Sequence, residues 1–270
     1  MKNFNNYFKL VVLSGFLLSI IAFVSCSNND SPSNDSRTYQ EVKEDFGSIV
    51  FTEGINDISL ESTLKNFFWD FRVIIPEGAS NTNKRPLIIS LHGAALSLSP
   101  DIHKATACLV EPGFNDIEPI IISPNSKGFL WQEDTSQFQI LSLLDFALTY
   151  LQVDPNKVVI TGYSDGGNGT WFYADFYPEL FSAAIPMASS HDTSNGLGSY
   201  VIYNIPMYVI HGSDDELFSV DLTEGYVNNS INVGSEIEFV IADGLTHNNS
   251  CDYVPYLKDA ASWLETTVWL

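Results

Sequence analysis

Short apolar runs bounded by turn residues recur along the chain from residue 46 onward. Pro86 to Leu91 and Pro119 to Pro124 are almost continuously apolar, which is typical of strands buried on both faces of a sheet. Lys157 to Thr161 has the same character. The pattern predicts further strands at Phe68–Pro76, Ala183–Ala188, Met207–Ile210 and Glu236–Ile241.

Helical signals lie between these strands. Gln137 to Leu151 is amphipathic, because Leu141, Leu144 and Leu148 recur on one stripe of a helix. Two more helices are expected at Asn168–Tyr177 and from Asp252 onward. Alternation of strands and helices predicts an α/β fold, in which helices cover both faces of a mostly parallel central sheet. We therefore expect one catalytic domain over residues 46–270.

The N-terminal segment has a different pattern. Lys2 and Lys9 precede or open a short apolar run, Leu10 to Val24, which is too short to span a membrane comfortably. Residues 1–25 are therefore predicted to be a signal peptide. The run ends in Ser-Cys, which resembles a bacterial lipobox and makes Cys26 the expected lipidation site. Ordinary cleavage with release and an uncleaved anchor are the alternatives.

Residues 26–45 are rich in Ser, Asn and Asp, and they are expected to form a flexible tether. This organisation predicts an exported protein, either periplasmic or a lipoprotein at the outer membrane or cell surface. The only expected contact with a membrane is through the lipid anchor.

Composition and charge narrow the classes of partner. Hydrophobic residues make up 45% of the chain, which is enough for a large core, and the net charge is −21. Such an acidic protein repels nucleic acids, so no nucleic-acid partner is expected. The sequence has no CxxC pair and no zinc-like spacing, and no metal or cofactor is expected. Cys108 and Cys251 either form a disulfide or remain two separate thiols. The oligomeric state is left open.

The sequence Gly162-Tyr163-Ser164-Asp165-Gly166 has the pattern G-x-S-x-G and directly follows the predicted strand ending at Thr161. A nucleophile at a strand-to-helix turn needs small neighbours, because the backbone is strained and other chain segments pass close by. Ser164 is therefore the predicted nucleophile. An ordinary Gly-rich turn is the alternative.

A second motif, His92-Gly93-Ala94, follows the strand that ends at Leu91. In this position a loop of small residues provides a backbone donor for an oxyanion. The expected donors are the N–H groups of Ala94 and of Asp165, the residue after the nucleophile. The side chain of His92 is interpreted as structural.

The acid and the base come from later loops. His211-Gly212-Ser213-Asp214-Asp215 follows a strand, and its spacing favours Asp215 as the acid that orients an imidazole, with Asp214 in reserve. His247 is the predicted base, because it follows the acid on a loop after the last strand.

These motifs resemble the α/β-hydrolase esterases grouped with feruloyl esterases and polyhydroxybutyrate depolymerases, and also related predicted peptidases and phospholipase/carboxylesterase proteins. The matching motifs lie in Asp154–Phe181, Ile205–Pro206 and His211–Asp215, and the similarity covers roughly residues 68–265. It implies an α/β-hydrolase fold and cleavage of carboxylic esters through an acyl-enzyme, with acyl or feruloyl groups on carbohydrate as the expected substrate. One departure is Asp165, where many relatives carry an apolar or amide residue.

The substrate-binding residues are less constrained by the pattern. Trp131 is either an aromatic wall of the site or part of a loop core. Tyr163, His191 and Phe218 are further candidates, because each lies near a predicted strand end or catalytic motif. Serine peptidase activity on short peptides and a non-catalytic binding role on a hydrolase fold are the alternative functions.

Overall fold

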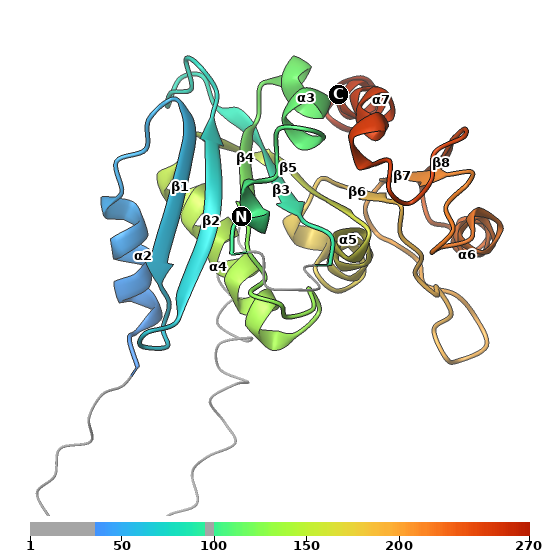
Figure 1. Ribbon diagram of the computed structural model, residues 1–270, viewed down its shortest axis with the longest axis horizontal. Coiled ribbons are helices and arrows are strands. Elements are labelled where there is room, and N and C mark those ends of the chain that lie inside the picture. Colours follow the sequence, from blue (N-terminus) through green and yellow to red (C-terminus); the bar gives the residue numbers. More distant parts are fainter. Residues whose placement is uncertain (1–35, 95–99) are drawn as a thin grey trace, which may run out of the picture. The chain divides into compact units, whose positions relative to one another are not determined.

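The central feature of the computed structural model, which describes residues 36–94 and 100–270, is an eight-stranded sheet (Figure 1). Its strand order is β1-β2-β4-β3-β5-β6-β7-β8. The six strands from β4 to β8 in this order are parallel, while β2 runs antiparallel to both β4 and β1. The bounds are β1 Gly54–Glu61, β2 Phe68–Ile75, β3 Arg85–Leu91, β4 Ile120–Pro124, β5 Val153–Tyr163, β6 Ala183–Met187, β7 Met207–Gly212 and β8 Ile237–Ala242.

The strands form because their apolar side chains are buried on both faces of the sheet. Ile88 and Ile89 on β3 are fully or almost fully buried, yet they belong to two different core clusters. Val158 and Val159 on β5 divide in the same way. Since successive side chains of a strand point to opposite faces, a continuous apolar run supplies both cores at once.

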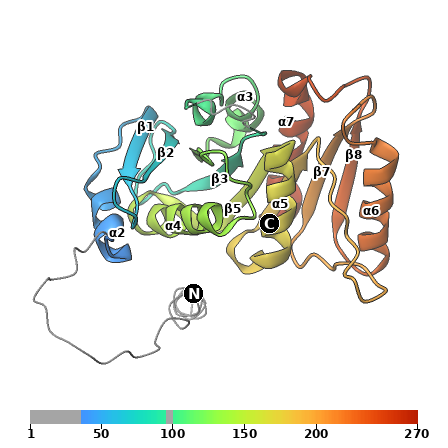
Figure 2. The same ribbon diagram turned by 60° about the horizontal axis from the view of Figure 1, so that its bottom comes forward.

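Helices cover each face of the sheet. Figure 2 separates α3 and α7 on one side from α2 and α4 on the other. The buried residues of α2, α4, α5 and α6 belong to one core, and those of α3 and α7 belong to the other. The bounds are α2 Tyr39–Ser48, α3 Val110–Phe114, α4 Asp134–Tyr150, α5 Asp165–Phe176, α6 Val220–Asn232 and α7 Val254–Trp263, with 3₁₀ turns at Ile102–Lys104, Asn115–Ile117, Pro178–Leu180 and Ser250–Tyr253 and a π turn at Leu264–Val268.

Helix α2 corrects the predicted end of the tether. The tether was expected to reach residue 45, but Tyr39–Ser48 is helical and Val42 and Phe46 are completely buried. A reciprocal cap starts this helix: the Glu41 N–H donates to the Thr38 hydroxyl, and the Thr38 N–H donates to the Glu41 carboxylate. The polar composition of this stretch concealed an amphipathic helix whose apolar face packs on the sheet.

The disulfide left open by the sequence is formed. Cys108 and Cys251 are bonded, with their Cα atoms 5.0 Å apart. The predicted signal peptide and Cys26 lie outside the described residues. Within residues 36–94 and 100–270, no helix is both long and apolar enough to cross a membrane.

Candidate active site

Ser164 lies between the end of β5 and the start of α5. Its φ of 57° and ψ of −119° place a non-glycine residue in a sparsely populated region of backbone space. This conformation turns the chain sharply from strand to helix, so the side chain of Ser164 stands clear of both elements. The site is at the carboxyl ends of the parallel strands, where α/β folds keep their ligand-binding loops.

The two glycines of the motif are required by close packing around this turn. A Cβ on Gly166 would lie 2.0 Å from the carbonyl oxygen of Leu91 at the end of β3. A Cβ on Gly162 would lie 2.2 Å from the carbonyl oxygen of Gly166. Both distances are far below van der Waals contact, so any other residue would displace backbone. Tight packing therefore fixes the nucleophile turn against the loop after β3.

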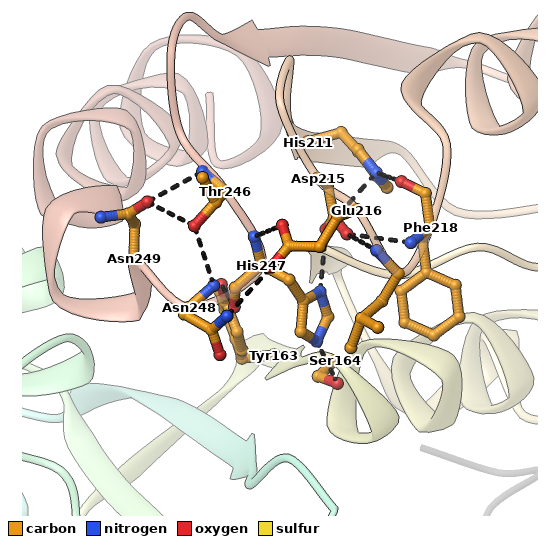
Figure 3. Close-up of polar contacts among 11 residues, drawn as sticks. Tyr163, Ser164, His211, Asp215, Glu216, Phe218, Thr246, His247, Asn248 and Asn249 are labelled. Carbon is orange, nitrogen blue, oxygen red and sulfur yellow. Dashed lines mark hydrogen bonds and ion pairs between the residues drawn. The ribbon is translucent and has the colours of Figure 1, made fainter.

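Ser164, His247 and Asp215 form a continuous chain of hydrogen bonds (Figure 3). The Oγ of Ser164 lies 2.9 Å from Nε2 of His247, and Nδ1 of His247 lies 2.9 Å from Oδ2 of Asp215. A carboxylate accepts only, so Nδ1 carries the proton and the Nε2 lone pair faces the serine hydroxyl. This is the arrangement in which an imidazole removes a proton from a serine.

Asp215, rather than Asp214, contacts the imidazole. The Asp215 side chain is fully buried, and its Oδ1 accepts the N–H groups of Leu217 and Phe218, both at 2.9 Å. These backbone donors stabilise the charged carboxylate in a site away from water. Asp214 is exposed and accepts a hydrogen bond from the hydroxyl of Ser213.

His211 lies behind the acid. Its Nε2–H donates to the carbonyl oxygen of Phe218 at 2.8 Å, and the same nitrogen is 3.7 Å from Oδ2 of Asp215. Burial lowers the pKa of His211, and this keeps the ring neutral at neutral pH. The residue therefore holds the loop that carries the acid.

Two contacts missed by the sequence analysis hold the loop of His247. The Glu216 carboxylate accepts the backbone N–H of His247 at 3.1 Å and the side-chain amide of Asn248 at 3.0 Å. The hydroxyl of Tyr163 donates to the carbonyl oxygen of His247 at 2.8 Å. The backbone N–H and the backbone carbonyl of His247 are thus each held by a hydrogen bond. Only the position of Glu216 beside Asp215 could have signalled its role.

The predicted oxyanion donors lie beside the nucleophile. Ala94 lines the cavity that contains Ser164, and a Cβ added to the preceding Gly93 would lie 3.5 Å from Cβ of Ser164. Asp165 is the first residue of α5, so its N–H has no carbonyl of the helix to pair with. Burial raises the pKa of the Asp165 carboxyl above its ordinary value.

His92 and Trp131 shape the loop from behind. The Ser126 N–H donates to Nε2 of His92 at 3.1 Å, and the other ring nitrogen lies 2.7 Å from the Gly93 carbonyl oxygen. Trp131 donates its indole N–H to the carbonyl oxygen of His92 at 3.0 Å. Trp131 is completely buried, so its interpretation as an aromatic wall is wrong; it belongs to the loop core.

A cavity of about 480 Å³ opens beside Ser164 and His247. The apolar part of its lining includes Leu91, Ile102, Leu109, Val110, Met187 and Leu217. Among the described residues around it there is no Asp, Glu, Lys or Arg. Nor do the described ranges contain a group of three or more His, Cys, Asp or Glu side chains arranged to hold a metal ion. The cavity can accommodate an uncharged group bonded to the carbonyl that Ser164 attacks.

The remaining candidates for substrate binding are divided between two places. Tyr163 lines this cavity. The ring of Phe218 stands edge-on to the imidazole of His247, with centroids 5.4 Å apart, so it packs on the base. His191 lies elsewhere: it stacks on Trp171 and lines a separate hollow beside α5. His191 therefore does not line the cavity that contains Ser164.

Solved structures with the same arrangement of elements include a thermostable esterase, with a TM-score of 0.65 and 20% identity over 78% of this chain and 62% of that one. The chain has the α/β-hydrolase fold. The chain is also similar in fold to a truncated carbohydrate esterase from gut microbiota, with a TM-score of 0.60 and 15% identity over 74% of this chain and 91% of that one.

One curated protein is similar in sequence to this chain. Cutinase est2 of Thermobifida alba is 26% identical over 157 residues, which are 56% of this chain and 49% of the cutinase. The match thus spans about half of the cutinase. No protein-family model matches the chain.

Proposed function

We propose that this protein is a serine hydrolase that cleaves carboxylic esters through an acyl-enzyme. The observation that carries the proposal is the hydrogen-bonded chain from Ser164 through His247 to the buried Asp215. The fold shared with esterases and the similarity to a cutinase support it. The same triad geometry recurs on unrelated folds, so it is recognised by the roles of its residues.

The steps follow from the positions of the donors and acceptors. Ser164 Oγ attacks the ester carbonyl while Nε2 of His247 takes its proton, and Asp215 stabilises the imidazolium that forms. The N–H groups of Ala94 and Asp165 bind the oxyanion. As the intermediate collapses, His247 returns the proton to the departing alcohol oxygen. Water then attacks the acyl-enzyme by the same route and releases the acid and free Ser164.

The proposed substrates carry an acyl or feruloyl group on a carbohydrate. The cavity supports an uncharged acyl group, because its described lining contains no Asp, Glu, Lys or Arg. The ionisable imidazoles in that lining are His92 and His247. A carbohydrate esterase among the structural neighbours supports the sugar part of the proposal.

A fluorophosphonate probe tests the nucleophile. We expect the wild-type protein to be labelled at Ser164 and the Ser164→Ala variant, folded by circular dichroism, to remain unlabelled. The variant should lose at least about three orders of magnitude in kcat on a p-nitrophenyl ester. Ser213→Ala, which removes a hydroxyl outside the cavity, is the matched control. Labelling of folded Ser164→Ala would refute the assignment.

A substrate panel tests the reaction class. Acetyl, butyryl and feruloyl esters of sugars are compared with the same acyl groups on p-nitrophenol and with short peptides. We expect kcat/KM to be highest on esters and negligible on peptides. Preference for peptides would replace the esterase proposal with the peptidase alternative, and a fully folded protein inert to the probe and to every substrate would favour the binding-protein alternative.

The export and lipid anchor predicted from the sequence remain part of the proposal. Support comes from the apolar run that ends in Ser-Cys and from the Cys108–Cys251 disulfide, which is typical of oxidising compartments. Detergent partitioning of the wild type and of Cys26→Ala tests the anchor. We expect only the wild type to enter the detergent phase, and equal partitioning would refute lipidation at Cys26.

A further inference from the structure

A second hollow, of about 620 Å³, lies beside α5 and away from the catalytic cavity. Its walls come from the end of α5 and from the segment after β6, which projects as a long loop (Figure 1). Helix α5 starts next to Ser164 and reaches Phe176 at the hollow, and twelve residues at 1.5 Å each make this about 18 Å. The hollow lies at the opposite end of this helix from Ser164. It would therefore contact a different part of a large substrate from the part that enters the catalytic cavity.

The loop that forms one wall of the hollow is held in shape by its own hydrogen bonds. The Val201 N–H donates to the Thr193 carbonyl oxygen at 2.7 Å, and the Asn195 N–H donates to the Ser199 carbonyl oxygen at 3.0 Å. The hydroxyl of Thr193 donates to the carbonyl oxygen of Tyr226, which ties the loop to α6. This hairpin carries Tyr200, which lines the hollow together with Phe176.

Two polar side chains in the hollow, Asp175 and His191, interact electrostatically with each other but form no hydrogen bond in the described part of the chain. The Asp175 carboxylate is half-buried and the imidazole of His191 is largely buried, but within residues 36–94 and 100–270 neither forms a hydrogen bond. Behind them Tyr203 is 3% exposed, and its hydroxyl has no partner in the same ranges. Desolvated polar groups without hydrogen bonds are costly in a folded protein. A ligand that supplies hydrogen bonds would offset that cost.

Apolar rings accompany these polar groups. Phe176 is 61% exposed and Tyr200 is 36% exposed, and Ile202 lies beside them at 49%. Exposed aromatic rings beside the Asp175 carboxylate and an imidazole, neither of which forms a hydrogen bond, favour a ligand that has an apolar face and hydroxyls at its edges. Burial lowers the pKa of His191, so its neutral ring offers one donor and one acceptor. A cation has only donors and would leave that ring N–H without a partner.

We propose that the hollow formed by Asp175, Phe176, His191, Asp192, Tyr200 and Ile202 binds a neutral sugar unit of an oligosaccharide or polysaccharide. The sugar ring packs on Tyr200 and Phe176, and its hydroxyls donate to the Asp175 carboxylate and pair with His191. As an addition to the proposed function, this site holds the polymer at a distance from the ester that Ser164 attacks. Binding at the hollow itself does not depend on esterase activity.

The test measures binding of ester-free sugars to the purified protein by calorimetry. The probes are unsubstituted hexasaccharides of β-linked xylose, mannose and glucose. We expect at least one to bind, and Tyr200→Ala, Phe176→Ala and Asp175→Asn each to raise its Kd by about threefold to tenfold. Phe68→Ala, which removes another exposed Phe ring on β2, is the matched control and should leave Kd unchanged.

Two readouts separate this proposal from the proposed function. The kcat/KM on p-nitrophenyl acetate should be unchanged in all four variants, because that substrate is too small to reach the hollow. Sugar binding without esterase activity would leave the sugar site standing and refute only the esterase. Absence of binding to all three hexasaccharides, or an equal Kd in the wild type and the three hollow variants, would overturn the sugar site. Binding of tetramethylammonium with the same sensitivity to the variants, in place of sugar, would also overturn it.

Discussion

Asp214 and Asp215 are adjacent in the sequence but have different surroundings. The Asp215 side chain is buried between two backbone donors and His247, whereas Asp214 faces solvent and pairs with Ser213. Successive residues of a loop point in different directions, so only one carboxylate can face the imidazole. The spacing of the motif after β7 was sufficient to select Asp215 from the sequence.

We expect Asp215→Asn to lower kcat on a soluble ester by about 10⁴, because an amide in this position favours the wrong tautomer of the imidazole. Asp214→Asn should stay within about threefold of the wild type, since its side chain contacts only the neighbouring hydroxyl. Steady-state kinetics of the two variants, with circular dichroism as the control for folding, checks this. A larger loss at Asp214 would transfer the role to that residue.

His92 contributes to the stability of the fold in its neutral form. Burial lowers the pKa of His92 to about 4, and Nε2 accepts the N–H of Ser126 only when it is unprotonated. The unfolded chain binds this proton more readily than the folded one between the two pKa values. The contribution of His92 to stability is therefore complete above about pH 6.5 and is lost as the pH falls towards 4.

The unfolding free energy of the wild type should fall between pH 6.5 and 4, with up to about 3 kcal/mol of the loss due to His92. In His92→Gln the slope should be smaller, because an amide does not titrate. It should not vanish, since burial also lowers the pKa of His103, His191 and His211. Urea denaturation at three pH values measures the slopes. Identical slopes would contradict the neutral role of His92.

The turn between β5 and α5 is the element on which the site is built. Its glycines allow the chain to pass within contact of the carbonyl groups at the end of β3. This close passage brings Ser164 next to Gly93 and the oxyanion loop. The pattern G-x-S-x-G after an apolar run predicted the turn, because the requirement for small residues is local.

We expect Gly166→Ala to lower the unfolding free energy by several kcal/mol and to abolish activity, since the added Cβ would overlap the Leu91 carbonyl. Gly225→Ala in α6 is the matched control. A Cβ there meets no atom within 4 Å, and alanine should stabilise the helix by about 0.5–1 kcal/mol. Denaturant titration of both variants checks that the unfolding free energy falls in Gly166→Ala and rises in Gly225→Ala. Equal stabilities for the two variants would argue against close packing at the turn.

Elements with strong local signals were predicted, and those that depend on tertiary contacts were not. The apolar cores of β3, β4 and β5 were found because they are buried on both faces. The edge strand β1 was missed, since Asn56, Asp57 and Ser59 give it a polar composition. Helix α6 was missed for a similar reason: it buries only three residues and contains several helix-disfavouring Asn and Gly.

The predicted positions of site residues fail where long-range contacts decide them. Trp131 was assigned to the substrate wall as one alternative, but its indole N–H pairs with a carbonyl 39 residues earlier in the chain. The contact between Glu216 and the backbone of His247 spans 31 residues. No local sequence pattern indicates either of these long-range contacts. The triad was accessible to sequence reasoning because each of its members directly follows a strand in chain order.

In the folded molecule, the disulfide connects two segments that both contribute to the lining of the catalytic cavity. Cys108 lines the cavity on a segment that includes Leu109 and Val110, and Cys251 lies four residues after His247. The bond closes a loop with a sequence separation of 143 residues. Both cysteines are exposed, so a reductant can reach them. The bond therefore supports the cavity wall and the loop of the base together.

We expect Cys251→Ala to lower the unfolding free energy by about 2–5 kcal/mol, because a loop of this length is costly to close in the unfolded chain. Esterase activity should also fall, and dithiothreitol should cause a similar loss in the wild type. The double variant Cys108→Ala/Cys251→Ala is the control and should not respond to dithiothreitol. A wild type that retains its stability after complete reduction would show that the bond contributes little.

The placement of this bond has a consequence for how the protein is made. During synthesis, β3, Cys108, Ser164 and Asp215 all precede His247 and Cys251. A growing chain that has reached Asp215 contains the nucleophile and the acid, but it has neither the base nor the partner for the early thiol. The general base and the covalent closure of the cavity then arrive within four residues of each other. Biosynthetic intermediates that end before His247 thus lack the complete hydrogen-bonded chain from Ser164 to Asp215, and the segment that completes it also makes the closure possible.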